Sequence, residues 1–326
     1  MQPDAFHIER WHTEDVDQQS GRLSGWDQEY RQTSCGRFTG RLVTAQGAGL
    51  TVIREHTSQS LHQKVVAPAG QLVFGWAIQH GHAVRVNRRP VAAGALIVLE
   101  GGREYDFRTE GATELLGVCV EEALCRERGG ERHALLLRDA VSHTVLELDG
   151  RVAAQLRPFW SALAGLLGEA PARPGATLRA GTAVDHLLLA LAGSARQPVP
   201  PMASERQARV VGMAIRTMRA CLHQDLQIAD LCAATHVSER TLRYHFEQCL
   251  HMSPQQYLKV LRLNAARGLL RALGGAPGRA PRQLNIAEIA AECGYAHASR
   301  FAGDYRRQFG ALPSDTLRAA AAGRLS

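Results

Sequence analysis

The sequence lacks the features that would place the protein in a membrane or in an oxidising compartment. No run of apolar residues approaches the roughly 20 that a helix needs to cross a bilayer. The first residues, Met1-Gln2-Pro3-Asp4, have neither the basic nor the apolar region of a secretion signal. The 7 cysteines are odd in number and contain no Cys-x-x-Cys pair, which disfavours a disulfide framework and a zinc site. We therefore expect a cytoplasmic protein with reduced thiols.

Complete catalytic motifs are also missing. The sequence has no interpretable set of Ser, His and Asp, no phosphate-binding glycine loop and no full set of metal ligands. His80 and His82 form a His-x-His pair of the kind that holds a metal in some β-barrel enzymes. No glutamate follows within the next few residues, however, and Gly81 between them is typical of a hairpin turn. We expect no metal, no cofactor and no enzymatic activity.

What the sequence does contain is a basic C-terminal segment. From Glu205 onward the chain has 17 Lys and Arg against 9 Asp and Glu, whereas the residues before it have 21 against 22. The net charge of +7 is thus confined to this segment. Such confinement is typical of a protein that binds a polyanion, since a solvated surface would spread the charge over the chain.

A pattern in the basic segment occurs twice. Residues 228–246 and 286–305 each predict a short amphipathic helix, a tight turn and a second helix. Ile228 and Ile286 both lie eight residues before a turn residue, which is His236 in the first copy and Gly294 in the second. One extra residue in the second turn then aligns the apolar core positions, which are Leu242 with Phe301 and Phe246 with Tyr305. This layout is that of a helix-turn-helix DNA reader, and two copies in tandem indicate a gene regulator.

Short motifs run through the segment from about Ala214 to Arg318. They include Ile228-Ala-Asp-Leu, Ser238-Glu-Arg-Thr-Leu-Arg, Ser253-Pro-Gln-Gln-Tyr, Ile286-Ala-Glu-Ile-Ala, Cys293-Gly-Tyr and Phe309-Gly. In these motifs the segment resembles the DNA-binding domain of the AraC/XylS family of bacterial transcription regulators. A long connection at residues 274–284 is similar to the branch that includes the ethanolamine-utilisation regulators. The resemblance implies two helix-turn-helix subdomains joined by a long helix, from about Pro254 to Leu273, that reach successive major grooves about 34 Å apart.

The resemblance places the DNA-reading residues on the second helix of each copy. Arg can pair with guanine and Glu can accept from cytosine, whereas other polar side chains contact phosphate. The expected DNA-binding residues are Ser238, Glu239, Arg240, Thr241, Arg243 and Tyr244 in the first copy, and His297, Ser299, Arg300, Asp304, Arg306 and Arg307 in the second. We expect Asp304 to add a negative charge that faces the DNA, and Arg306 and Arg307 to contact phosphates. The alternative for each residue is a solvated helix face.

The length of 326 residues suits two domains, each large enough to bury a core. Residues 197–204 are rich in proline and predict a semi-rigid linker. We therefore expect an N-terminal domain at residues 1–195, a linker at 196–204 and a DNA-binding domain at 205–326. The connection at residues 274–284 is rich in Gly and Pro and predicts a mobile loop.

The N-terminal domain has the pattern of a β-barrel or sandwich followed by helices. Eight short segments separated by turn residues predict strands at residues 38–45, 50–55, 64–67, 72–79, 83–86, 95–99, 105–108 and 114–120. Two apolar helical stripes follow, at residues 156–167 and 184–191. The resemblance implies a cupin-like β-barrel that senses an effector, followed by dimerisation helices. Burial in a core is the alternative for both stripes. The predicted fold class is a multidomain α+β chain with an all-α C-terminal domain.

Several N-terminal residues are candidates for binding an effector. Phe74, Trp76 and Tyr105 are expected to line or fill the barrel. On an extended strand, Arg85 and Arg89 would project from one face and could grip a phosphate or a carboxylate. An anionic effector is therefore one hypothesis, and a solvent-facing hairpin is the alternative.

These features together predict a sequence-specific transcription regulator that responds to a small effector. The resemblance implies an activator that binds double-stranded promoter DNA as a homodimer, beside RNA polymerase, and that is associated with the nucleoid when bound. Two alternatives remain. One is a cupin-type metalloenzyme with an appended nucleic-acid-binding module, and the other is a ligand-independent regulator controlled by a protein partner.

Overall fold

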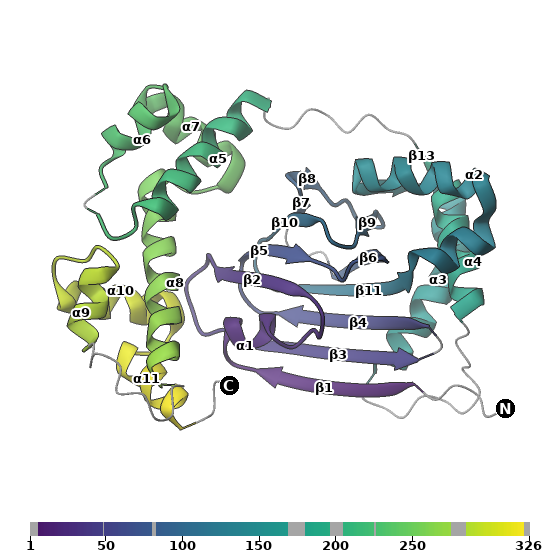
Figure 1. The fold of residues 1–326 in the computed structure, drawn as a ribbon, viewed down its shortest axis with the longest axis horizontal. Coiled ribbons are helices and arrows are strands. Elements are labelled where there is room, and N and C mark those ends of the chain that lie inside the picture. The colour runs from purple at the N-terminus through teal and green to yellow at the C-terminus, as the bar shows by residue number, and fades with distance from the viewer. Residues whose placement is uncertain are drawn as a thin grey trace. The chain divides into compact units, whose positions relative to one another are not determined.

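The structure is a computed structural model that describes residues 6–47, 49–79, 83–168, 180–195, 205–224, 226–274 and 285–322. The chain divides into two compact units, of which the first comprises residues 1–30 and 39–199 and the second comprises residues 31–38 and 200–326 (Figure 1). The predicted linker at 196–204, the pair His80 and His82 and nearly all of the predicted loop at 274–284 lie outside the described residues. All 7 cysteines are free.

The first unit is built on two antiparallel sheets. The eight-stranded sheet has the order β1-β3-β4-β11-β6-β9-β12-β13, and the five-stranded sheet has the order β2-β5-β10-β7-β8. The strands are β1 (His7–Thr13), β2 (Asp27–Gln32), β3 (Gly40–Gly47), β4 (Leu50–Thr57), β5 (Leu61–Val66), β6 (Gln71–Gln79), β7 (Val84–Val86), β8 (Arg89–Pro90), β9 (Leu96–Glu100), β10 (Glu104–Thr109), β11 (Thr113–Glu121), β12 (Val145–Leu148) and β13 (Ser194–Ala195). A β-rich N-terminal domain with helices is thus confirmed, and its two sheets are open rather than closed into one barrel.

Alternation along the strands gives the eight-stranded sheet two buried faces. In β4, Val52 turns toward the helices, whereas Ile53 and Glu55 line a cavity that also has walls from the five-stranded sheet. The partner strand β11 pairs Val118 with Val52 and Leu115 with Glu55, so the same alternation holds across the pair.

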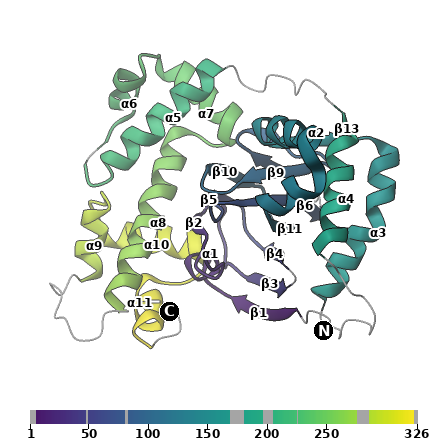
Figure 2. The same ribbon diagram turned by 45° about the vertical axis from the view of Figure 1, so that its right-hand side comes forward.

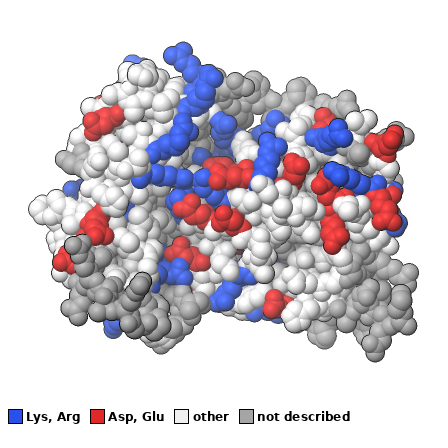
Figure 3. All heavy atoms as spheres, in the orientation of Figure 1, with Lys and Arg blue, Asp and Glu red and all other residues white. Residues whose placement is uncertain are grey.

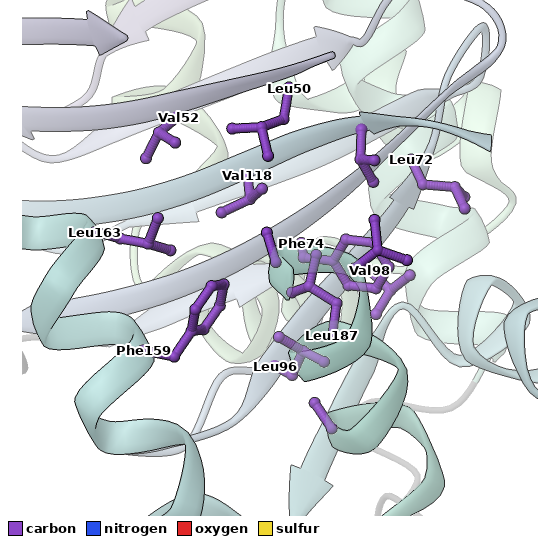
Figure 4. Close-up of a cluster of buried hydrophobic side chains, with 14 of the residues drawn as sticks. Leu50, Val52, Leu72, Phe74, Leu96, Val98, Val118, Phe159, Leu163 and Leu187 are labelled. Atoms are coloured by element: carbon purple, nitrogen blue, oxygen red, sulfur yellow. The ribbon is translucent and has the colours of Figure 1, made fainter. Parts of the chain in front are cut away.

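Helices cover one face of the eight-stranded sheet (Figures 1 and 2). They are α2 (Glu122–His143), α3 (Gly150–Leu166) and α4 (Ala180–Ala192), and a short helix, α1 (Val16–Ser20), precedes β2. Phe159 and Leu163 of α3 and Leu187 of α4 pack against Phe74 and Val98 of the sheet (Figure 4). Both predicted apolar stripes are therefore core, which is the alternative that the sequence left open.

The second unit is helical. Its helices are α5 (Glu205–Ala220), α6 (Ile228–Thr235), α7 (Glu239–Leu250), α8 (Pro254–Gly274), α9 (Ile286–Glu292), α10 (Ala298–Phe309) and α11 (Pro313–Ala321). The long helix α8 contributes to two apolar clusters, since Tyr257 and Leu261 pack with α5, α6 and α7, and Leu263 and Leu270 pack with α9 and α10. The predicted connecting helix is confirmed. None of the helices among the described residues is long and apolar enough to cross a membrane.

Residues 31–38 also belong to the second unit. The amide of Gln32 donates to the main-chain oxygen of Gln308 at 2.8 Å, and the amide of Gln308 donates back to the main-chain oxygen of Gln32 at 2.9 Å. Asn264 of α8 donates to the main-chain oxygen of Gln32 at 3.1 Å. Both glutamines are almost fully buried, so these bonds satisfy polar groups that would otherwise be costly to bury.

Candidate nucleic-acid interface

Helices α6 and α7 form the first helix pair, and its ends are fixed by local contacts. The carboxylate of Asp230 accepts from the main-chain N–H of Gln227 at 2.8 Å at the start of α6. Helix α6 ends at His236, whose φ of 55° lies in the left-handed region. The hydroxyl of Ser238 then accepts from the main-chain N–H of Thr241 at 3.2 Å and begins α7. These caps set the tight turn between the two helices.

Helices α9 and α10 repeat the arrangement. Asn285 and Glu288 accept from each other's main-chain N–H groups, at 2.9 and 2.8 Å, at the start of α9. Gly294 in the turn has a φ of 75°, and a Cβ placed there would lie 2.8 Å from the guanidinium of Arg262. The left-handed backbone conformation therefore favours a glycine here, and a larger residue would also displace the guanidinium of Arg262.

The two pairs correspond position by position. Ile286 begins α9 58 residues after Ile228 begins α6, whereas Phe301 of α10 follows Leu242 of α7 by 59 residues. Leu242 and Phe301 are both fully buried, as are Phe246 and Tyr305. The predicted extra residue in the second turn and the predicted core positions are confirmed.

The exposed side of α7 carries most of the residues that the sequence indicated. Glu239, Arg240, Arg243 and Tyr244 are exposed, and Tyr244 is 55% exposed although it is a large aromatic residue. The guanidinium of Arg243 lies 2.7 and 2.9 Å from a carboxylate oxygen of Glu239, one helical turn away. This pair holds a cation and an acceptor side by side on the surface.

The exposed side of α10 carries smaller side chains than the exposed side of α7. With the offset of 59 residues, Arg240, Arg243 and Tyr244 correspond to Ser299, Ala302 and Gly303. On α10 and at its N-cap, the exposed polar residues are His297, Ser299, Arg300, Arg306 and Arg307. The large exposed polar and aromatic side chains are therefore concentrated on α7.

Asp304 differs from the sequence-based expectation that it faces the DNA. Its side chain is buried, and its carboxylate lies 2.6 Å from the ammonium of Lys259 on α8 and 3.5 Å from the guanidinium of Arg307. The same offset aligns it with His245, which lies on the inner part of α7. Asp304 therefore ties α10 to α8 and brings no free negative charge to the surface.

Helix α5 carries basic residues that the sequence reasoning missed. Arg206, Arg209 and Arg216 are exposed on the side of α5 opposite its buried Val211, Ala214 and Met218. Lys and Arg side chains gather over this helix in Figure 3. The charge of Arg206 is felt by His245, whose pKa is lowered first by burial and then by this arginine, so α5 brings its cations close to α7. The sequence could have indicated this surface, because these arginines fall on one helical face and no Asp or Glu lies between Arg206 and Gln224.

The predicted effector-binding residues of the first unit are scattered. Phe74 is fully buried between sheet and helices, and Tyr105 is fully buried with its hydroxyl accepting from the main-chain N–H of Glu100 at 2.9 Å. Trp76 lines a cavity between the two sheets. Among the described residues, no cluster of three His, Cys, Asp or Glu side chains is arranged to hold a metal ion.

Arg85 and Arg89 do not share one extended strand. Asn87 and Arg88 have left-handed φ values of 47° and 69° and turn the chain, so that Arg85 pairs with Pro90 and Val86 pairs with Arg89. Arg85 and Arg89 consequently project from opposite faces of the hairpin, because paired residues share a face. The guanidinium of Arg85 also lies 2.5 Å from the carboxylate of Glu110. The assumption that the two arginines form one grip is wrong.

Comparison with known proteins agrees with the helix pairs. A family model described as a helix-turn-helix domain matches residues 231–319. The chain is 36% identical over 110 residues to the probable thc operon regulatory protein of Rhodococcus erythropolis, covering 33% of this chain and 31% of that one. It is 26% identical over 297 residues to the XylDLEGF operon transcriptional activator 1 of Pseudomonas putida, covering 87% and 86%. The second unit holds an AraC-type helix-turn-helix domain.

The AraC-type domain accounts for only part of the chain. The match spans about a third of the length of two relatives, namely 31% of the Rhodococcus erythropolis protein and 30% of the transcriptional regulator GbdR of Pseudomonas aeruginosa. A solved AraC-type regulator from Chromobacterium violaceum has 27% identity and a TM-score of 0.31, covering 36% of this chain and 97% of that one. The resemblance to the AraC/XylS family is confirmed for the segment that carries the motifs.

Proposed function

We propose that this protein is a sequence-specific DNA-binding transcription regulator, an activator whose N-terminal unit senses a small molecule. The observation that carries the proposal is the repeated helix pair, in which α6 with α7 and α9 with α10 have matching caps and cores on the shared helix α8. The relatives support the same function, since two of them are named as a probable operon regulatory protein and an operon transcriptional activator.

In this proposal, each helix pair is a helix-turn-helix subdomain and α7 and α10 are the reading helices. Helix α7 recognises bases through Arg240, Arg243 and Tyr244, with Glu239 holding Arg243 in position. Helix α10 contributes mainly phosphate contacts through Arg300, Arg306 and Arg307, because its other exposed side chains are small.

The exposed arginines of α5 extend the proposed surface. Arg206 lies close enough to α7 to affect His245, and Arg209 and Arg216 continue along the same side of α5. Cations beside a reading helix fix its register on the duplex through the phosphate backbone. We therefore add Arg206, Arg209 and Arg216 to the phosphate-binding residues, and we leave out Asp304.

The first unit is proposed to be a cupin-like effector domain at residues 1–195, joined to a DNA-binding domain at residues 205–326. Dimerisation through the first unit and contact with RNA polymerase complete the proposal, because two readers on two half-sites bind more tightly than one. Because the α3 and α4 stripes are core, a dimer contact would use other helix faces, such as those with Leu135 of α2 and Leu189 of α4, which are 67% and 42% exposed. A regulator of promoters works in the cytoplasm, at the nucleoid.

The proposal is tested by mapping the DNA that the protein occupies across the genome of its host, together with the transcripts that change when the gene is deleted. Sharp sites beside genes that lose expression are expected for an activator. The matched control is a strain that carries the double substitution Arg240→Ala and Arg243→Ala, in which these sites should be lost while the protein level is unchanged. Diffuse occupancy in both strains would overturn the proposal.

A further inference from the structure

A cavity lies between the two sheets of the first unit. Its volume is about 80 Å³, and it has walls from β2, β4, β5, β6, β9, β10 and β11. Four aromatic side chains, Trp26, Tyr30, Trp76 and Phe107, line it together with aliphatic and polar residues. A single buried water needs only about 10–15 Å³, so the cavity has room for a group of several heavy atoms.

One wall of the cavity carries a buried carboxylate that has no cation. Glu55 is 9% exposed, and it accepts from the amide of Gln19 at 3.0 Å and from the hydroxyl of Tyr30 at 3.1 Å. Thr13 donates to the amide oxygen of Gln19 at 2.6 Å, which turns the amide nitrogen of Gln19 toward Glu55. No Lys, Arg or His of the described residues forms an ion pair with Glu55.

The surroundings of Glu55 fit the ionised carboxylate in hydrogen bonding but not in charge. Gln19 and Tyr30 both donate hydrogen bonds to it, whereas burial raises its pKa. Burying an ionised carboxylate without a cation is costly, and a cation at hydrogen-bond distance reduces that cost. The Glu55 carboxylate therefore has hydrogen-bond donors but no positively charged group beside it.

A second acceptor in the same cavity lacks a donor. The side-chain oxygen of Gln28 is buried and has no hydrogen-bond partner, while the other end of the same amide is engaged with Tyr30. Gln28, Tyr30 and Glu55 all line the cavity. Buried acceptors without donors are rare in folded proteins and call for an explanation.

We propose that this cavity binds a small protonated amine with an apolar body, whose ammonium group lies against Glu55 and Gln28. An ammonium group supplies both the missing charge and several N–H donors. The aromatic walls suit the apolar body and favour a cation near their faces. The inference rests on the proposed effector-sensing role of the first unit. It replaces the hypothesis of an anionic effector, because a carboxylate or phosphate would be repelled by Glu55.

Calorimetry and thermal denaturation of the full chain with isobutylammonium test this inference. Isobutanol and isobutyrate are the matched neutral and anionic probes of similar shape, and KCl controls for ionic strength. Isobutylammonium at about 100 times its Kd should raise Tm by about 5 °C or more. Isobutanol, isobutyrate and KCl should leave Tm within about 1 °C. Equal shifts with the alcohol, a larger shift with the carboxylate, or no shift with the amine would each overturn the proposal.

Substitutions locate the effect. Glu55→Gln keeps the size of the side chain but removes its charge, and it should weaken the binding of isobutylammonium at least tenfold. Glu104→Gln is the charge-matched control, since Glu104 is 59% exposed and pairs with Lys64 outside the cavity. An unchanged affinity of Glu55→Gln for isobutylammonium would contradict the placement of the ammonium group beside Glu55. If this variant fails to fold, the series of probes on the unsubstituted protein still decides.

The result can be separated from that of the proposed function. Binding of isobutylammonium is measured without DNA, and occupancy of the mapped sites is measured without isobutylammonium. Loss of sites with amine binding intact would overturn the regulator and not the cavity, and the opposite pattern would overturn the cavity alone.

Discussion

Two buried carboxyl groups show how surroundings decide what a residue contributes. Asp304 lies beside Lys259 and stabilises the contact between α10 and α8, so its charge is compensated. Glu55 receives two hydrogen bonds and no cation, so its charge weakens the unliganded fold. A buried charge that lowers stability is more readily explained by binding than by folding.

The pH dependence of stability should reveal Glu55. Burial raises its pKa above the ordinary value of 4.5 in the folded chain, so between these two pKa values the folded state binds more protons than the unfolded state. Stability from this group is therefore full below about pH 4.5 and is lost as pH rises through the folded pKa, by about 1.4 kcal/mol for each unit of the shift. Chemical denaturation between pH 4.5 and 8 should show a shallower loss for Glu55→Gln than for the unsubstituted chain. Parallel curves for the two proteins would contradict this account.

Arg243 and Arg307 should differ in what their loss does to DNA binding. Arg243 pairs with Glu239 on the exposed face of α7. We expect Arg243→Ala to weaken the free energy of operator binding by about 1–3 kcal/mol and to relax specificity at one base position. Arg307→Ala should weaken binding to operator and random DNA alike, because phosphate contacts do not read sequence. Fluorescence anisotropy on an operator set with single-base changes separates the two. Similar losses on all sequences for both variants would remove Arg243 from base reading.

At the scale of elements, the turns of the two helix pairs differ in the residue that adopts the left-handed conformation, and substitutions can test this difference. His236 and Gly294 both occupy the left-handed region, but only the glycine does so without steric cost. His236→Gly should therefore raise the free energy of unfolding by up to about 1 kcal/mol. Gly294→Ala should lower it by about 1–2 kcal/mol, because an alanine at this positive φ carries the steric cost of the left-handed conformation. Urea denaturation of the full chain measures both, and changes of the same sign would show that the turns are not equivalent.

Sequence alone predicted the elements whose apolar pattern is periodic. The helix pairs and eight strands have clear periods, and Ser238 and Gly294 mark helix boundaries by local chemistry. Strand β2 was missed because its inward side chains, Gln28 and Tyr30, are polar and give no apolar alternation. Strand β1 was missed because most of its residues are exposed.

The exposure of candidate site residues was predictable where it follows from their position along a single helix. The outward face of α7 could be read from a period of 3.6 residues, and it agrees with the exposed residues. Asp304 could not be placed in this way, because its partner Lys259 lies 45 residues earlier on another helix. Glu55 gave no signal either, since its donors Gln19 and Tyr30 come from distant parts of the chain and are brought together only by folding.

At the scale of the whole molecule, charge is divided between the two parts of the chain. The segment from Glu205 onward carries the whole basic excess, and the residues before it are close to neutral. Binding to DNA should therefore depend on salt through the second unit alone, and it should release one counterion for nearly every phosphate that an arginine contacts.

The salt dependence of binding tests the part that α5 plays in this surface. The logarithm of the binding constant should fall linearly with the logarithm of salt concentration, with a slope of about −0.9 for each phosphate contacted. The double substitution Arg209→Ala and Arg216→Ala should make the slope shallower by about 2, because both side chains are exposed on the basic side of α5. Arg126→Ala is the control, since Arg126 is also exposed but belongs to the first unit and pairs with Glu122. A slope that changes equally in the control and the double variant would mean that net charge, rather than contact with phosphate, sets the effect. An unchanged slope in the double variant would confine the DNA contacts to α7 and α10.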